Sequence, residues 1–365
     1  MEEHNRIETV KCTSSDTHPI SAMGRMSVKT VQSFLKIMGI EYEKGLPAEA
    51  YLMAWYEEFC GSREWVLYML PKPYLLLLLE IWDSDTVEMD PIRWDMIQNL
   101  KMFGFVNYRR GNERNHAESE IFAIRSMRQN FYFMLKSRES RKKMDRYERW
   151  ETALLGMLYY YGIVPLNELH RLFEEAVGEK IGYDRFVSFI RCRADLWGHG
   201  VFVKDRKKQE FFMIRNVESA ELTLLMVREH EDLPYKRIDY RDLEYVRNGF
   251  GIDNRWNGVS ELGSFLVQDM DMSYYRSTVL VHTILVSIQN GMTLEKIQEK
   301  IGFISFYDEE DRQTAEKYVN IMYESIPVYE YKGYSRSEYR KICLKNDRNR
   351  RRKRFTMLPG GKQES

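Results

Sequence analysis

The feature that most limits how this chain can fold is a succession of three amphipathic segments and two short apolar runs between residues 152 and 214. Apolar residues recur at helical spacing in each of the three segments, and glycines separate one segment from the next. Residues 201–203 and 211–214 are apolar and flank a polar stretch, which predicts a β-hairpin. Three helices followed by a hairpin form the winged-helix plan, a helix-turn-helix with a β wing.

A similar succession precedes it between residues 90 and 124. Asp90 followed by Pro91 predicts the start of a helix, and Gly104 suits its end. Residues 105–108 and 121–124 then predict two strands joined by a polar loop. We therefore expect a mainly α-helical fold with small β-hairpins, in which two winged-helix-like units lie in tandem and the basic helical stretch 125–149 joins them.

The remaining segments complete the expected domain organisation. Residues near the N-terminus lack periodicity and are polar, and the residues after 340 are rich in arginine. We expect a flexible leader (1–28), a helical domain with the first winged-helix-like unit (29–145), the second unit (146–220), a helical C-terminal domain (221–340) and a basic disordered tail (341–365).

Charge is informative only locally. The chain has 55 basic and 55 acidic residues, but residues 345–354 contain seven basic residues and one acidic residue. The rest of the chain therefore carries a net charge of −6, because the ten residues contribute 7 − 1 = +6. Such a run can make several phosphate contacts, and a tail that only improves solubility is the alternative.

Two phrases resemble a group of uncharacterised bacterial proteins. The phrase SIPVYEYKGYSRSEY, from Ser325 to Tyr339, is similar to their turn after a long helix, aromatic-Lys/Asn-Gly-Tyr/His-Ser/Thr-x-x-Glu. The phrase LYYYGIVPLNEL, at residues 158–169, resembles their helix-turn-helix opening. The resemblance implies winged-helix-like units. Many members end in a cysteine-rich SEC-C tail that binds metal, but only Cys343 lies near the end here, so the resemblance implies no metal site and transfers no activity.

Candidate nucleic-acid-binding residues lie where a winged helix presents them. Cations there neutralise phosphates, and Gln or Asn side chains read base edges. The alternatives are ordinary solvated surfaces and a winged helix that binds protein. The candidates are Arg185, Arg191 and Arg193 on the third helix, Lys204, Arg206, Lys207 and Lys208 on the wing, Arg350, Arg351 and Arg352 in the tail, and Arg93, Gln98, Asn99, Lys101, Arg109, Arg110 and Arg114 in the first unit.

No catalytic or cofactor motif is present. Four widely spaced cysteines and scattered histidines predict neither disulfides nor a zinc site. An acidic group before the helix at residue 91 is a weak magnesium candidate, but Asp90 suits an N-cap better. The glycine-rich stretch 249–258 lacks the features of a phosphate loop and is expected to be a surface loop. The acidic group consists of Asp83, Asp85, Glu88 and Asp90.

These patterns favour a non-enzymatic nucleic-acid-binding or regulatory protein of a bacterial cytoplasm. The first alternative is a protein–protein interaction or scaffold protein without nucleic acid, and the second is an enzyme with an unrecognised site. We expect no cofactor, no metal and no membrane segment, since the longest apolar run is about half the length that spans a bilayer. A homo-oligomer is possible.

Overall fold

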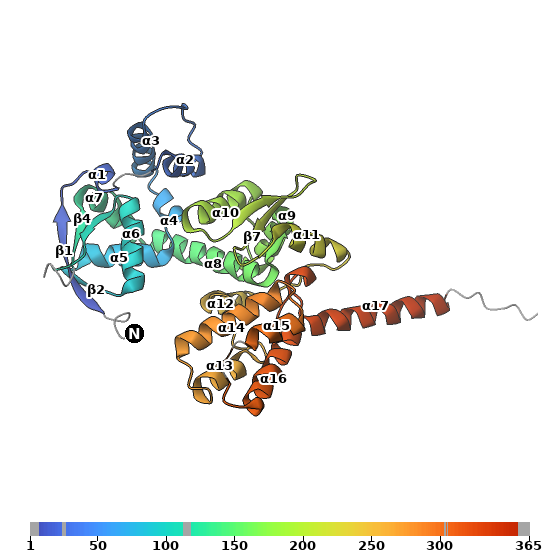
Figure 1. Cartoon of the computed structure of the whole chain (residues 1–365). Helices are drawn as coiled ribbons and strands as arrows, with labels where there is room; N and C mark the ends of the chain where they lie inside the picture. The colour runs from blue at the N-terminus through green and yellow to red at the C-terminus, as the bar shows by residue number, and fades with distance from the viewer. Residues whose placement is uncertain (1–6, 24–26, 112–117, 303, 305, 357–365) are drawn as a thin grey trace, which may run out of the picture. The chain divides into compact units, whose positions relative to one another are not determined.

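The computed structural model describes residues 7–23, 27–111, 118–302, 304 and 306–356. Helices dominate the described chain, and two small sheets of four and three strands accompany them (Figure 1). This confirms the expected mainly helical class. The chain divides into two compact units: unit 1 comprises Met1–Glu151 and Asp184–Gly198, and unit 2 comprises Thr152–Tyr183 and His199–Ser365. The five expected domain boundaries stay predictions.

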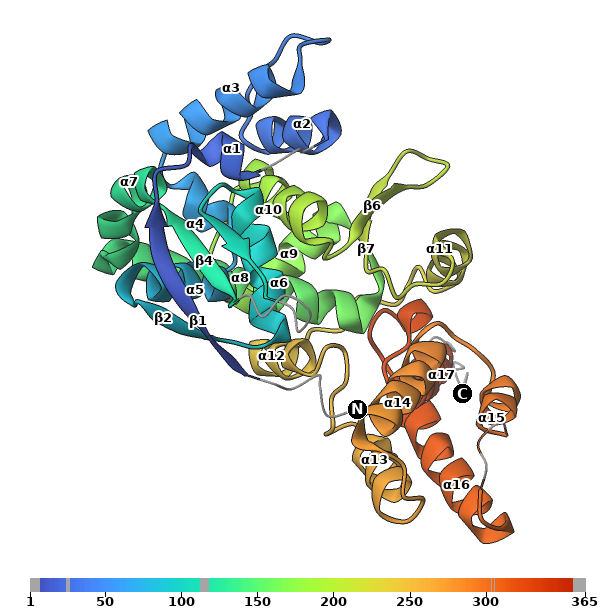
Figure 2. The ribbon, with the colours of Figure 1, turned by 60° about the vertical axis from the view of Figure 1, so that its left-hand side comes forward.

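The sheet of unit 1 has the strand order β2-β1-β4-β3. Strand β1 (Glu8–Ser15) pairs antiparallel with β2 (Thr86–Met89) and parallel with β4 (Glu120–Ile124), and β3 (Val106–Arg109) pairs antiparallel with β4 (Figure 2). The predicted hairpin strands are thus confirmed as β3 and β4. Their sheet is larger than expected, because β1 occupies the other edge of β4.

The expectation of a flexible leader over residues 1–28 is wrong where the chain is described. Residues 8–15 form β1, and α1 (Pro19–Met23) follows. Val10 and Cys12 are buried while Thr9 and Lys11 are exposed, so the strand presents an apolar face to the core. Only two strongly apolar positions mark this alternation, and hydrogen bonds to strands far along the chain stabilise it.

Aromatic side chains form much of the core of unit 1. Phe59 stacks on Trp55 with ring centroids 4.7 Å apart, and Phe103 stacks on Phe34 at 5.3 Å. As predicted, Asp90 caps α6 by accepting a hydrogen bond from the Arg93 backbone N–H at 2.7 Å. The helices of this unit are α2 (Val28–Ile37), α3 (Ala48–Gly61), α4 (Trp65–Met69), α5 (Lys72–Asp83), α6 (Pro91–Met102), α7 (Arg125–Lys136), the first part of α8 (Arg138–Tyr161) and nearly all of α10 (Tyr183–Trp197).

The sheet of unit 2 is antiparallel and has the order β5-β7-β6. The predicted hairpin is confirmed, because β6 (Val201–Lys204) pairs with β7 (Glu210–Met213). A short strand, β5 (Ile163–Pro165), pairs with the other edge of β7 and was not predicted. Ile163 and Phe211 from this sheet form a small core with two residues of α11 (Ala220–Glu229).

A second core of unit 2 lies among its C-terminal helices, where Leu266, Leu285, Ile297 and Val319 are buried. Each comes from a different helix, so this core is built from four apolar helix faces. The remaining helices of unit 2 are α9 (Leu166–Val177), α12 (Tyr240–Asn248), α13 (Val259–Gln268), α14 (Tyr274–Gln289), α15 (Leu294–Ile301), α16 (Glu309–Ser325) and α17 (Arg336–Thr356).

The expectation of a basic disordered tail over residues 341–365 is wrong for residues 341–356, which continue α17. The remaining residues, 357–365, lie outside the described residues. None of the helices within the described ranges combines the length and the hydropathy that crossing a bilayer requires.

The position of β1 inside the sheet gives a stability prediction. Val10 is fully buried, so Val10→Asp places a charge in the core and should lower the free energy of unfolding by about 3 kcal/mol or more. Thr9→Asp changes the exposed neighbouring position and should change it by less than about 0.5 kcal/mol. Urea denaturation of both variants measures the difference. Two equally mild variants would show that residues 8–15 do not belong to the sheet.

Candidate functional site

Arg193 was predicted to contact nucleic acid from the third helix of the second winged-helix-like unit, and this prediction is wrong. Its side chain is 0% exposed within unit 1, and its Nε lies 2.8 Å from Glu151 Oε2. Its Nη1 donates to the backbone carbonyls of Tyr68 and Met69, at 3.0 and 3.2 Å. These carbonyls end α4, so Arg193 caps that helix and is not available to a phosphate.

Other residues of α10 also bind the end of α4. Trp197 Nε1 donates to the Met69 carbonyl at 2.7 Å, and the Tyr68 hydroxyl donates to the Arg185 carbonyl at 3.1 Å. Burial raises the pKa of the neighbouring Cys192 thiol to about 11, despite the Arg193 charge beside it. One side of α10 is therefore committed to packing within unit 1.

The two remaining candidates on α10 differ in exposure. The guanidinium of Arg185 lies over the Trp150 ring, 5.4 Å from its centroid, and the residue is exposed. Arg191 is half-buried. Of the three predicted cations on this helix, only Arg185 is exposed, and its guanidinium donates to the Tyr147 hydroxyl at 3.2 Å.

The wing, which we define as β6, β7 and the turn between them, is organised by Asp205. Its carboxylate is almost entirely buried, accepts a hydrogen bond from the Gln209 backbone N–H at 2.8 Å and pairs with Arg228. The Lys208 N–H donates to the Asp205 carbonyl at 3.0 Å, which closes the turn. A buried carboxylate thus holds a tight turn in place at the tip.

The predicted cations of the wing are all exposed. Lys204 pairs with Glu210 at 2.9 Å and Arg206 pairs with Glu221 at 2.6 Å. Such exposed pairs contribute little free energy. Lys207 and Lys208 lie at the tip of the turn. The wing therefore presents up to four cations to solvent.

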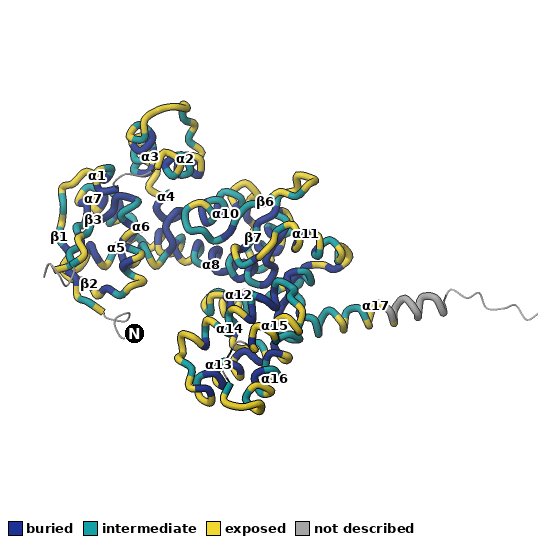
Figure 3. Tube along the Cα trace, in the orientation of Figure 1, coloured by how far each residue is buried: buried dark blue, intermediate teal, exposed yellow. Residues whose placement is uncertain are grey.

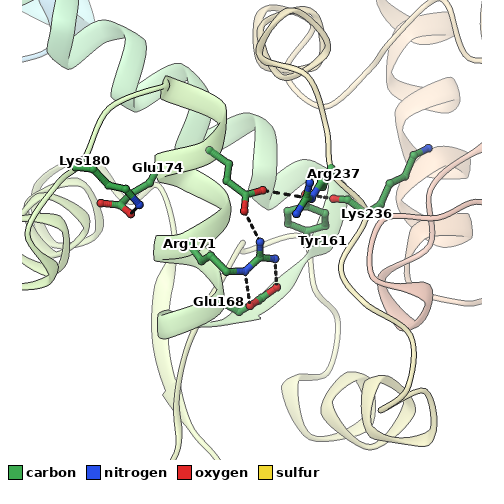
Figure 4. Close-up of polar contacts among 8 residues, drawn as sticks. Tyr161, Glu168, Arg171, Glu174, Lys180, Lys236 and Arg237 are labelled. Atoms are coloured by element: carbon green, nitrogen blue, oxygen red, sulfur yellow. Dashed lines mark hydrogen bonds and ion pairs between the residues drawn. The ribbon is translucent and has the colours of Figure 1, made fainter.

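The surface of α9 carries a different kind of network (Figure 4). Arg171 donates to Glu168 and to Glu175, at 2.6 and 2.5 Å, and Arg237 lies 3.4 Å from Glu175. Glu174 accepts from the Ile181 N–H, which together with a neighbouring lysine lowers the pKa of its carboxyl. Cations and carboxylates balance on this surface, so α9 offers no basic patch.

Two glycine–tyrosine contacts join the two phrases that resemble the bacterial group. Gly333 lies against the ring of Tyr161, where a Cβ atom on the glycine would come within 2.7 Å of the ring. Gly162 lies against the ring of Tyr329 in the same way. Both glycines have positive φ angles, 89° and 68°, so neither the space nor the backbone accepts another residue. These contacts fix the turn that precedes α17.

Lys332 occupies the centre of that turn. It is 7% exposed, and its Nζ donates to the carbonyls of His230 and Leu233 at 2.7 and 2.8 Å. These carbonyls follow the end of α11, so the ammonium caps that helix. Burial lowers the pKa of Lys332, and the Glu231 charge opposes this shift. The buried amine ties the turn to α11.

A capping box starts α17 from the same turn. The Ser335 N–H donates to Glu338 at 2.9 Å, and the Glu338 N–H donates to the Ser335 hydroxyl at 3.3 Å. Glu338 also pairs with Lys236 at 2.7 Å. The first turn of α17 is therefore rigidly connected to the rest of unit 2.

Beyond this root, α17 runs away from the other elements of unit 2 (Figure 1), and its described positions from Arg340 onward are exposed or half-buried (Figure 3). Residues 345–354 of this helix contain seven basic residues and one acidic residue. Arg350, Arg351 and Arg352 belong to this stretch of helix. The structure thus presents the predicted basic tail as an extended basic helix.

The candidates of the first unit are mostly engaged with neighbouring side chains. Arg93 pairs with Glu80, Arg109 lies 3.1 Å from Glu120, and Lys101 and Arg110 lie over aromatic rings. Gln98 is exposed and Asn99 donates to the Asp95 carbonyl at 3.1 Å. Arg114 lies outside the described residues.

Two carboxylates of the acidic group before α6, Asp83 and Asp90, have partners within the protein. Asp83 is partly desolvated, but hydrogen bonds from Tyr132 and Lys136 lower the pKa of its carboxyl, and Asp90 serves as the N-cap. Across the ranges that the structure describes, no three His, Cys, Asp or Glu side chains are close enough together to hold an ion.

No protein-family model, curated protein or solved structure matches this chain. The resemblance to the uncharacterised bacterial group accordingly stays a prediction. Lys332 and the two packed glycines belong to the two phrases that resemble this group. Their structural roles were not predicted, because the residues that they contact lie far away in sequence.

The buried pair of Arg193 and Glu151 gives a second prediction. Arg193→Met leaves the carboxylate and two carbonyls without their partner and should lower the free energy of unfolding by about 3–5 kcal/mol. Arg185→Met changes a residue of the same helix about two turns away from Arg193 and should cost less than about 1 kcal/mol. Denaturant titration measures the free energy of unfolding of both variants. Equal losses of free energy in the two variants would mean that Arg193 is not buried.

The packed glycines give a third prediction, for which the chain supplies a matched control. Gly333→Ala should combine the strain of a positive φ, about 1–2 kcal/mol, with a clash against Tyr161. Gly45 has the same φ of 89° with nothing within 4 Å of a Cβ position, so Gly45→Ala should show the strain alone. Thermal denaturation compares the two. Equal losses would mean that the turn is not packed against Tyr161.

Proposed function

We propose that this chain binds nucleic acid without catalysis, mainly by neutralising phosphates with the basic stretch of α17. The observation that carries the proposal is the placement of seven basic residues among residues 345–354 of a helix that leaves unit 2 from a rigid root. A polyanion gains from such a helix because its bound counterions are released when the cations replace them.

The wing supports the same proposal from within the same unit. Its turn is fixed by the buried Asp205, and its exposed cations Arg206, Lys207 and Lys208 lie at adjacent positions. The succession α8, β5, α9, α10, β6, β7 and the strand order β5-β7-β6 follow the order of a winged-helix plan along the chain, but α10 belongs to unit 1 and the strands belong to unit 2. As part of this proposal, α6, β3 and β4 form the first of two winged-helix-like units in tandem.

The structure changes how we expect the protein to read its ligand. A winged helix usually places its third helix in the major groove, but α10 uses Arg193 and Trp197 for packing. Few of its polar side chains are left to contact base edges. We therefore propose that phosphate contacts from α17 and the wing provide most of the affinity and that α10 contributes little.

Charge neutralisation on α17 tests the proposal. The quadruple variant should lower affinity for a short duplex at least about tenfold in low salt and should flatten the slope of log K against log salt by up to about 3.6, because each lost phosphate contact contributes about 0.9. Fluorescence anisotropy over a salt range measures both quantities. The four changes are Arg348→Gln, Arg350→Gln, Arg351→Gln and Arg352→Gln.

The control removes the same charge elsewhere, from exposed lysines of unit 1, and should leave the slope nearly unchanged. If both quadruple variants weaken binding equally, the loss of affinity depends on the net charge of the protein and not on α17. Absence of any binding to duplex or single strand, with a protein partner retained instead, would favour the scaffold alternative. The control changes are Lys29→Gln, Lys36→Gln, Lys44→Gln and Lys142→Gln.

A further inference from the structure

A pocket of about 550 Å³ opens between the end of α12 and the helices α13 and α14 of unit 2. Its volume lies in the range of sites that hold small organic molecules. None of its lining residues is charged, in a chain in which 30% of residues are charged. Because phosphate and carboxylate groups need a cation or an oriented set of donors, this lining favours a neutral ligand.

Two aromatic rings stand at the rim of this pocket. Phe250 is 79% exposed and Tyr274 is 80% exposed, although large apolar rings usually bury most of their surface. Phe250 also has a φ of 51°, which is unfavourable for a residue with a Cβ atom. A ring held outward in this way is available to stack on a flat partner.

The loop that holds Phe250 is fixed by its neighbours. A Cβ on Gly249 would overlap the Ile252 carbonyl, and a Cβ on Gly251 would come within 2.8 Å of the Tyr159 ring. Only glycine fits at these two positions, so the backbone on either side of Phe250 has little freedom. The backbone that carries the exposed ring is thus held by close packing on both sides of Phe250.

Hydrogen-bonding groups also line the pocket. Asn254 and Gln268 have exposed carboxamides, and Ser260 and Ser264 have exposed hydroxyls. A carboxamide offers a donor and an acceptor side by side, which matches the edge of a nucleobase. Aromatic rings and carboxamides together are the groups with which proteins hold unpaired bases.

We propose that this pocket binds one unpaired nucleobase of a single-stranded nucleic acid, stacked on Phe250 or Tyr274 and contacted at its edge by Asn254 and Gln268. The inference rests on the proposed function, since α17 and the wing supply the phosphate contacts that bring a strand to unit 2. A sugar is also neutral, but only a base has a flat π face that stacks on the exposed rings.

Two variants change the pocket without changing its backbone: one removes an aromatic ring and the other fills the volume. Phe250→Asn removes the ring and suits the positive φ, so its melting temperature should not fall. Gly263→Leu fills the pocket from α13, where nothing lies within 4 Å of a Cβ position. Gly263→Ala is the matched control, because its single methyl leaves most of the volume open.

The first experiment uses free adenosine and uridine, which carry no phosphate and therefore do not depend on α17. Saturation-transfer NMR should detect binding to the unmodified protein and to Gly263→Ala, and little or none to Phe250→Asn and Gly263→Leu. Absence of nucleoside binding, or binding that both pocket variants retain, would overturn the inference. Binding of monosaccharides in place of nucleosides would overturn it as well.

The second experiment separates the inference from the proposed function. Anisotropy should show a single strand binding about fivefold or more tightly than a duplex of the same sequence, because a duplex has no free base to stack. The pocket variants should remove this preference and leave duplex affinity unchanged. The α17 quadruple variant should weaken both ligands equally. If the α17 quadruple variant binds both the single strand and the duplex with unchanged affinity while nucleosides still bind the pocket, the proposed function is wrong and the inference about the pocket is kept. If the pocket variants retain the preference for a single strand, the inference about the pocket is wrong.

Discussion

Reciprocal packing of two glycines against two tyrosines fixes the part of unit 2 from which α17 starts. Gly162 lies under Tyr329, Gly333 lies under Tyr161, and both backbones have positive φ angles. A side chain at either glycine would push strand β5 away from the turn that precedes α17. The amine of Lys332 and the capping box of α17 both depend on that turn, so the direction of the basic helix follows from these contacts.

Among the described residues, each unit buries one cation at the end of a short helix. Arg193 binds the last carbonyls of α4, and Lys332 binds the carbonyls that follow α11. In both places a positive side chain satisfies groups that would otherwise lack a partner and interacts favourably with the negative end of the helix dipole. The buried basic residues Arg193 and Lys332 therefore stabilise helix ends. The cations of the wing, by contrast, are exposed.

Local patterns predicted the elements that local interactions stabilise. The N-cap Asp90 and the hairpin of β6 and β7 depend on residues close in sequence, and both were found from the sequence. Strand β1 was missed because it pairs with residues more than 70 positions away, as Lys11 does with Thr86 and Glu120. Arg193 was misassigned because a helical pattern shows which residues share a face but not which other helix covers it.

Amide hydrogen exchange tests most directly whether α17 is a polyanion-binding helix on a fixed root. Like charges three and four positions apart destabilise residues 345–354 in the free protein, so their amides should exchange rapidly, while those of residues 328–340 exchange slowly. A single-stranded oligonucleotide in low salt should slow exchange at 345–354 at least about tenfold, because phosphates relieve the repulsion. Exchange at 345–354 that the oligonucleotide leaves unchanged, or rapid exchange at 328–340 in the free protein, would contradict the account.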